Sequence, residues 1–403
     1  MANDRLSDHR GDLWTTRGPV DIPFLLLTLL LLGIGVVMVL SASYASAYYD
    51  VKKITGGNAT YFFTRQLAFA VAGVGAMYIV SRLPMRFFRR ISGLTMLIAL
   101  VLLLAVLVVG HVSGGGRRWI YLGGVSIQPS EIAKIAVILY FATLICRSGN
   151  YMGTFRYGIL PFVLILAVIV GLLVMEPHFS ASIIILLLGA VMMFIGGTRL
   201  VVFILGLIAG GGLFAVMLLA SNYASSRITT WRDPFSDTSD AGWQIVQSLY
   251  AVGSGGLFGL GLGQSRQKYL YLPEEHNDFI FSIICEELGF IGALLILALF
   301  ALLIIRGYWI AMHSRDRYSF LVVTGVTSLL AIQVFLNVAV CTNLIPCTGI
   351  SLPFFSYGGT ALLMQLAEMG IILSASRDVP EKKVIRKRKR TELRRGETVV
   401  PGI

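Results

Sequence analysis

The stretch LPEEHNDFIFSIICEELG, residues 272–289, joins a polar, acidic segment directly to a long apolar run. It places Asp278 at the boundary of a segment that is apolar enough to cross a lipid bilayer. Because a carboxylate is costly next to a hydrocarbon core, one that is kept there usually has a function. Asp278, with His276 two residues before it, is therefore the first candidate for chemistry in this chain.

The rest of the chain reads as a membrane protein. Of its 403 residues, 56% are hydrophobic and 13% are charged, and the mean hydropathy is +0.79. Apolar runs of about 18–25 residues recur, and each can cross a hydrocarbon core of about 30 Å as a helix. Their apolar residues do not alternate with polar ones, which favours helices over a closed β-barrel. We therefore predict an all-α, polytopic membrane protein with about ten spans, centred near Leu30, Val71, Leu102, Val137, Leu166, Leu187, Leu207, Leu294, Ala331 and Met369.

The distribution of basic residues predicts the orientation of the chain. The net charge of +12 gathers in segments that are cytoplasmic if the N-terminus is inside. This pattern places both termini in the cytoplasm. We expect the basic tail to contact anionic lipid or a cytoplasmic partner, and not nucleic acid, because no aromatic-interleaved groove accompanies it. The first twenty residues are polar and mixed in charge, so we expect no cleavable signal peptide and a retained first span.

Three regions follow from this topology: an N-terminal cytoplasmic tail (1–20), a membrane domain (21–377) and a basic C-terminal tail (378–403). A long extracytoplasmic segment, about 221–278, separates spans seven and eight, and it is too long to be an unstructured loop. Its part DAGWQIVQSLYAV, 240–252, predicts a short amphipathic helix. The glycine-rich stretch 253–265 lacks the flanking strand and helix of a nucleotide-binding loop, so we expect its glycines to allow close packing in the bundle.

Asp278 supports two interpretations. Ser282 follows one helical turn later, and Glu286 lies at the edge of the same helix face. These three side chains can therefore face one space, with Asp278 as a general base. Alternatively, Asp278 caps the helix that follows, since aspartate is a favoured cap. One residue can do both.

Other charges lie on the predicted outer side. Glu131 and Lys134 follow Pro129 at i, i+3 spacing and should pair, either as a structural ion pair or facing a substrate. Several cations oppose the positive-inside bias, which indicates an anionic ligand such as a phosphate, although any single one can be a solvated loop charge. These outer cations are Arg117, Arg118, Arg227, Arg232, Arg266 and Lys268.

Aromatic, histidine and cysteine residues give weaker signals. Trp119, Trp231, Trp243 and Tyr357 could stack on sugar rings or form the interfacial aromatic belt. The histidines and cysteines show no metal-ligand spacing. Cys341 and Cys347 could bridge, but packing roles are favoured for all four cysteines.

Six motifs, in order along the chain, resemble one family. They are GGRRWIYLGGVSIQPSEIAK, EPHFSAS, WRDPF, GWQIVQSLYAVGSGGLFGLGLGQS, LPEEHNDFIFSIICEELG and NLIPCTGISLPFFSYGG. Together they resemble the SEDS family (shape, elongation, division and sporulation), which includes FtsW, RodA and SpoVE. The form LPFFSYGG and the basic tail are more similar to the division and sporulation branch. One departure is His178, which stands where many members have aspartate.

The resemblance implies a peptidoglycan glycosyltransferase that polymerises lipid II on the outer face of the bacterial plasma membrane, with septal localisation. It implies that Asp278 is the catalytic aspartate and that Glu131 and Lys134 match the family's acid and lysine. Single displacement with inversion needs one base and a cationic clamp, because a pyrophosphate leaves without protonation. No cofactor is required, although a divalent cation (Mg²⁺ or Mn²⁺) could share the clamp. The candidate substrate-binding residues are Arg117, Arg118, Glu131, Lys134, Arg227, Arg232, Lys268, His276, Ser282 and Glu286.

The expected partners are lipid II, membrane lipid, a class B penicillin-binding protein transpeptidase and other division proteins. Two other functions remain open from the sequence. A lipid II flippase could use the intramembrane charges, but these lack the midplane position and inverted repeats typical of transporters. A non-catalytic division scaffold would not need Asp278.

Overall fold

The computed structural model describes residues 18–49, 54–113, 116–122, 125–206, 208, 210, 230–236 and 240–378. Its long helices are α1 (Ile22–Tyr48), α2 (Tyr61–Arg82), α3 (Met85–Val109), α4 (Pro129–Ser148), α5 (Leu160–Met175), α6 (Phe179–Gly196), α9 (Asp240–Ser254), α10 (Ile280–Met312), α11 (Arg317–Cys341) and α12 (Gly359–Ser376). Two short helical turns, Gly149–Gly153 and Phe155–Ile159, precede α5.

Within these described ranges, nine helices are long and apolar enough to cross a membrane. They match nine of the predicted spans, and the all-α membrane class is confirmed. The span predicted around Leu207 lies mostly outside the described residues, although residues 200–206 are helical. Residues 1–17 and 379–403, which make up most of the two predicted tails, and Arg227 also lie outside the described part of the chain.

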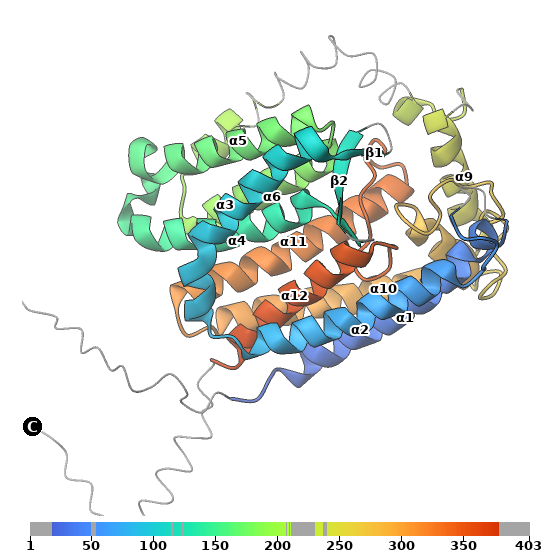
Figure 1. Ribbon diagram of the computed structural model, residues 1–403, viewed down its shortest axis with the longest axis horizontal. Coiled ribbons are helices and arrows are strands. Elements are labelled where there is room, and N and C mark those ends of the chain that lie inside the picture. Colours follow the sequence, from blue (N-terminus) through green and yellow to red (C-terminus); the bar gives the residue numbers. More distant parts are fainter. Residues whose placement is uncertain are drawn as a thin grey trace, which may run out of the picture.

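The helices pack around α11, which contacts α4, α6, α10 and α12. Figure 1 shows α11 between an upper group containing α3, α5 and α6 and a lower group containing α1 and α2. The described chain begins and ends at one end of this bundle, where the backbone N–H of Gly18 donates to the carbonyl of Arg377 at 3.1 Å. Asp21 caps α1 there and pairs with Arg306 at 2.6 Å. This arrangement agrees with termini on the same side of the membrane.

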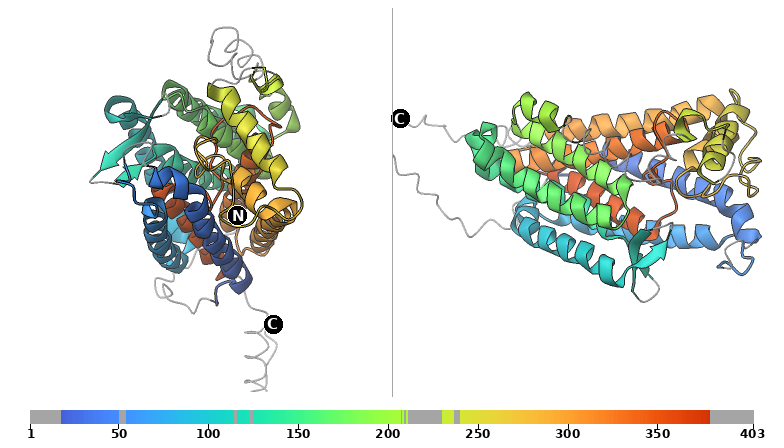
Figure 2. Two further views of the ribbon diagram at one scale, coloured as in Figure 1. Left: turned by 90° about the vertical axis from the view of Figure 1, so that its right-hand side faces the viewer. Right: turned by 90° about the horizontal axis from the view of Figure 1, so that it is seen from above.

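A small antiparallel sheet at the opposite end was not predicted. Its strands are β1 (His111–Ser113), β2 (Gly116–Leu122) and β3 (Val125–Ile127), in the order β1-β2-β3. In the register, Ser113 pairs with Gly116 and Leu122 with Val125. Glycine pairs between β-branched and aromatic residues are a hairpin signal, so the sequence did contain the information. Figure 2 (left) views the molecule from this end, with the sheet at one edge and α9 at another.

The glycine-rich segment 255–263 supplies backbone hydrogen-bond partners at a break in α10. Gly289, at φ 70° and ψ −173°, interrupts the helix. Beside this break, the N–H groups of Leu260 and Gly261 donate to the carbonyls of Glu286 and Glu287, and that of Phe290 donates to the carbonyl of Gly256. Irregular backbone at membrane depth is stable only when protein satisfies its polar groups. The predicted close packing of these glycines is therefore observed.

Two buried carboxylates anchor the loop that follows. Glu286 accepts from the backbone N–H groups of Arg266 (3.0 Å) and Gln267 (3.3 Å). Glu287 accepts from Nζ of Lys268 at 3.0 Å and from the hydroxyl of Ser41 at 2.6 Å. A buried charge is tolerated only with such partners. The two acids thus fix the 265–268 loop to α10 and α1.

The close approach of Gly255 to the backbone of α10 predicts a strict requirement for glycine at position 255. A Cβ there would lie 2.0 Å from the carbonyl oxygen of Cys285, so Gly255→Ala must push α9 away from α10. We expect a loss of several degrees in the thermal unfolding midpoint of the detergent-solubilised protein. Gly253→Ala is the matched control, because no atom lies within 4 Å of a Cβ at that position. Equal effects of the two substitutions would contradict this packing account.

The Lys268–Glu287 pair predicts non-additive stability changes. Lys268→Met leaves Glu287 as a buried charge without its cation, and breaking a buried pair costs about 3–5 kcal/mol. In the double variant Lys268→Met/Glu287→Gln neither charge remains, so we expect the thermal midpoint to recover part of the loss. Thermal unfolding of both variants and of Glu287→Gln measures this coupling, and simple additivity would contradict it.

Candidate functional site

A cavity of about 670 Å³ lies among the segments on the sheet side of the bundle. Its walls come from the first turns of α2, α4, α6 and α12, from β2, and from the segments 274–279 and 347–352. Polar residues such as Gln128 and Ser351 line it together with apolar side chains such as Phe69, Ile184 and Leu362. The cavity therefore offers polar and apolar surface together, as an amphiphilic ligand requires.

Asp278 lines this cavity and is held through its backbone. Asn337, which is fully buried on α11, donates from Nδ2 to the carbonyls of Asp278 (2.9 Å) and Ile350 (2.6 Å). One amide thus joins the 274–279 segment to the 347–352 segment. Gly349 faces the carboxylate: a Cβ there would lie 2.9 Å from Oδ2 of Asp278, and the φ of +68° also favours glycine.

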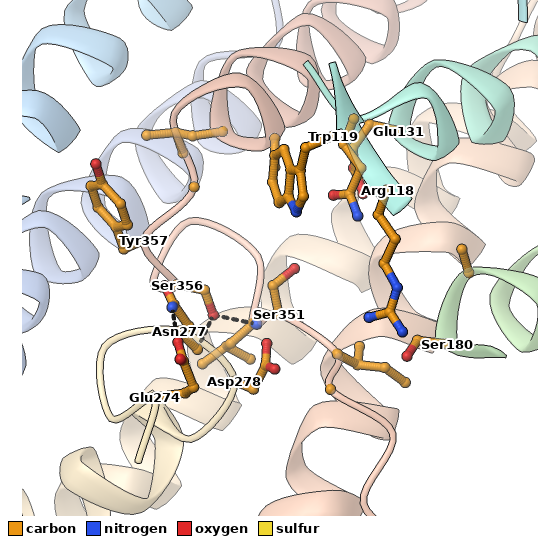
Figure 3. Close-up of a pocket in the computed structure, with 18 of the residues that line it drawn as sticks. Arg118, Trp119, Glu131, Ser180, Glu274, Asn277, Asp278, Ser351, Ser356 and Tyr357 are labelled. Atoms are coloured by element: carbon orange, nitrogen blue, oxygen red, sulfur yellow. Dashed lines mark hydrogen bonds between the residues drawn. The ribbon is translucent and has the colours of Figure 1, made fainter. Parts of the chain in front are cut away.

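Asp278 does not occupy the N-cap position of α10. The helix begins at Ile280, and its N-cap residue, Phe279, makes no side-chain capping hydrogen bond. In Figure 3 the Asp278 carboxylate extends from the 274–279 segment, and Arg118 extends from β2, into the same space. The role of Asp278 as a general base stays a prediction.

The residues before Asp278 are fixed by the segment that leads into α12. The hydroxyl of Ser356 donates to the carbonyl of Asn277 at 2.7 Å, and the N–H of Tyr357 donates to the carbonyl of His276 at 2.8 Å. The His276 ring packs against Phe62 and Tyr357, with centroid distances of 4.5 and 5.8 Å. His276 lines the cavity as predicted, and these contacts make it part of a rigid wall.

Arg118 connects the sheet to the turn between α5 and α6. Its guanidinium donates to the carbonyl of Pro177, and it lines the cavity. Burial raises the pKa of Glu176 in this turn to about 8, although the charge of Arg118 opposes the shift. Burial lowers the pKa of His178 to about 3, and the charges of Arg118 and Lys134 lower it further. His178 is therefore neutral near pH 7.

Glu131 and Lys134 form the predicted ion pair, with Nζ of Lys134 2.8 Å from Oε2 of Glu131. Both line the cavity, and their side chains are 12% and 3% exposed. The predicted pairing is therefore confirmed, and the pair lies at the cavity wall.

Five predicted residues lie away from the cavity. Lys268 and Glu286 belong to the buried anchor of the 265–268 loop, so their predicted contact with substrate is not supported. Ser282 is fully buried and its hydroxyl contacts that of Ser248 at 2.6 Å, so it does not share the space of Asp278. Arg117 points to the carbonyl of Leu107, and Arg232 is exposed elsewhere. Helical spacing from Asp278 was the wrong guide because α10 begins only after it.

Sequence reasoning missed several lining residues. Arg65 lies near the outer start of α2, and its guanidinium is 4.8 Å from the ring of Tyr61. It is one more cation against the positive-inside bias, so the same signal could have found it. Gln128, Ser180 and Ser351 also line the cavity, but nothing distinguishes such residues in the sequence. Trp119 and Tyr357, considered as sugar-stacking residues, do line it.

The structure bears on two other sequence interpretations. None of the four cysteines forms a disulfide, so Cys341 and Cys347 do not bridge. Among the described residues, no group of three His, Cys, Asp or Glu side chains could hold a metal ion.

Comparisons with known proteins agree with the six sequence motifs quoted in the sequence analysis. The model of the FtsW/RodA/SpoVE family, described as a cell cycle protein, matches residues 23–381. Stage V sporulation protein E of Bacillus subtilis strain 168 is 43% identical over 366 residues, covering 90% of this chain and 98% of that protein. A probable peptidoglycan glycosyltransferase FtsW of Trichlorobacter lovleyi is 40% identical over 359 residues, covering 88% and 93%.

Solved structures show the same fold. A chain from a structure on the coordination of polymerization and crosslinking by a peptidoglycan synthase complex matches with a TM-score of 0.75 and 26% identity, covering 90% of this chain and 99% of that one. The rod shape determining protein RodA of Thermus thermophilus matches with a TM-score of 0.66 and 26% identity, covering 90% and 98%. The chain therefore belongs to the FtsW/RodA/SpoVE family, as its six motifs predicted.

Proposed function

We propose that this protein is a peptidoglycan glycosyltransferase that polymerises lipid II on the outer face of the plasma membrane, with Asp278 as the general base. The observation that carries the proposal is a carboxylate aimed into a cavity that also holds cations from three other elements. These are Arg65 of α2, Arg118 of β2 and Lys134 of α4. The names of the FtsW relatives support the same activity.

The chemistry needs few protein groups. A hydroxyl of the acceptor sugar attacks the anomeric carbon of the donor, a carbon–oxygen bond forms, and the bond to the lipid pyrophosphate breaks. The hydroxyl proton passes to the Asp278 carboxylate. The pyrophosphate leaves as an anion, so no acid has to protonate it. Single displacement inverts the anomeric carbon.

Arginine suits the leaving group because its guanidinium makes paired hydrogen bonds to phosphate oxygens. Arg118 and Arg65 are the clamp candidates in the described cavity. Lys134 is already neutralised in part by Glu131, so its contribution is to keep that carboxylate from repelling the pyrophosphate. Fixed cations stabilise developing charge without reorganising during the reaction.

The partner and the place of action are part of the proposal. A synthase complex of similar fold that coordinates polymerization and crosslinking supports pairing with a transpeptidase, which we take to be a class B penicillin-binding protein. Similarity to a stage V sporulation protein and to FtsW proteins supports work at the division or sporulation septum.

Removing the base predicts loss of polymerisation. Asp278→Asn keeps the size of the side chain but cannot accept the proton, so we expect a rate at least about 100-fold lower. The measurement is glycan formation from lipid II by purified protein in liposomes, with and without a cognate transpeptidase. Equal product from wild type and variant would remove Asp278 from the role of base. Lipid II crossing the bilayer without chain growth, unaffected by the substitution, would indicate a flippase.

The hydrogen bonds from Asn337 to the carbonyls of Asp278 and Ile350 predict that Asn337 positions the candidate base. Asn337→Ala releases Asp278 and Ile350 from α11, and misplacement by about 1 Å can cost about 100-fold in rate. We expect a fall in kcat with little change in KM, because Asn337 does not line the cavity. Thr324→Val is the control, since Thr324 is a buried polar residue of α11 that bonds only within its own helix, to Phe320. Proportional losses of kcat and folded protein would reduce Asn337 to a stability role.

A further inference from the structure

A second cavity, of about 700 Å³, lies beside the first and has no role in the chemistry above. Three aromatic residues line it: Trp243 of α9, Tyr269 and Tyr271. Gln264, Arg266 and Gln267 contribute amides and one cation. Tyr269 and Tyr271 are 48% and 54% exposed, so their rings are available to a ligand.

This cavity is rigid because Glu286 of α10 holds the backbone of the 265–268 loop that lines it. The backbone N–H groups of Arg266 and Gln267 are held by Glu286, as described above, so the side chains of both residues project from a fixed backbone. The indole N–H of Trp243 donates to the carbonyl of Tyr271 at 2.7 Å and fixes the aromatic wall. A preformed site loses little conformational entropy when it binds a ligand.

The polar groups of the cavity indicate what it binds. Gln264 and Gln267 each present a side-chain amide among the residues that line the cavity. Side-chain amides both donate and accept, which suits the hydroxyl and acetamido groups of an amino sugar. Tyrosine and tryptophan offer apolar ring faces for sugar rings and polar tips for hydroxyls. Arg266 is exposed and suits a carboxylate on the sugar or its peptide.

The two cavities are lined by residues that are close together in the sequence. Gln244 lines the catalytic cavity and Trp243, the residue before it, lines the second. Likewise Tyr271 lines the second cavity and Glu274 the first. Neighbouring Cα atoms are about 3.8 Å apart, so the walls of the two cavities approach each other at these positions.

We propose that the second cavity binds the growing glycan strand, a polymer of alternating N-acetylated amino sugars. This inference rests on the proposed polymerase function and extends it to the product. A strand held there stays at high effective concentration near the catalytic cavity between additions. The protein then adds many units before release, and loss of the site shortens the chains without slowing each addition.

The first test measures binding without catalysis. In the Asp278→Asn background, a soluble tetrasaccharide of alternating N-acetylglucosamine and N-acetylmuramic acid is titrated against purified protein. We expect Tyr269→Ala to weaken the affinity at least about tenfold, or about 1.4 kcal/mol. Arg266→Ala, an exposed substitution that spares the aromatic wall, should weaken it as well. Tyr250→Ala is the control, because Tyr250 is an exposed tyrosine of α9 that lines neither cavity.

Two results would overturn the proposal. One is no tetrasaccharide binding, or equal binding by the Tyr269→Ala, Arg266→Ala and Tyr250→Ala proteins. The other is unchanged tetrasaccharide affinity together with loss of transpeptidase co-purification in Tyr269→Ala, which would assign the cavity to that partner.

The second test measures chain length in an otherwise wild-type background. We expect Tyr269→Ala to shorten the glycan several-fold while the initial rate of lipid II consumption stays within about twofold of wild type. Equal losses of rate and length would place Tyr269 in the catalytic step and overturn the proposal. If wild type makes no glycan but the tetrasaccharide binds through Tyr269, the polymerase function fails and the sugar site stands.

Discussion

The structure depends on one constraint: every backbone polar group inside a bilayer needs a partner from the protein. Helix α10 violates its own hydrogen-bond pattern at Gly289, and the segment around Gly259 supplies the missing partners. These hydrogen bonds fix the 255–263 segment against α10 at one position. The first turns of the same helix directly follow Asp278, whose backbone is held by Asn337 of α11.

The acidic residues near this break form two groups that differ in their surroundings. Glu286 and Glu287 are buried and fully engaged in holding the 265–268 loop. Asp278 lies eight residues before Glu286, ahead of the first residue of the helix, and Asn337 holds it through its backbone carbonyl. Asp278 also lines the cavity. The cavity thereby combines a fixed backbone frame with a candidate base.

Much of this could be predicted from the sequence, for identifiable physical reasons. Span positions follow from hydrophobicity alone, and nine of the predicted spans appear as helices in the described residues. Asp278, Glu131 and Lys134 were recognisable because charge at a membrane boundary is costly. Ser282 and Lys268 were assigned wrongly to the substrate, because helical spacing and loop charge do not reveal which partners a fold brings. Asn337 and Gly349 gave no signal, since their importance lies in contacts with residues 59 and 71 positions away.

The contact between Gly349 and Asp278 also restricts how this protein can evolve. As long as an acid occupies position 278 in this conformation, any side chain at position 349 meets its Oδ2 atom at 2.9 Å. The positive φ of Gly349 penalises the same substitutions independently. A side chain at position 349 therefore has to displace the Asp278 carboxylate and adopt an unfavourable backbone conformation at the same time. The direction in which the Asp278 carboxylate points is thus set in part by the absence of a side chain 71 residues further along the chain.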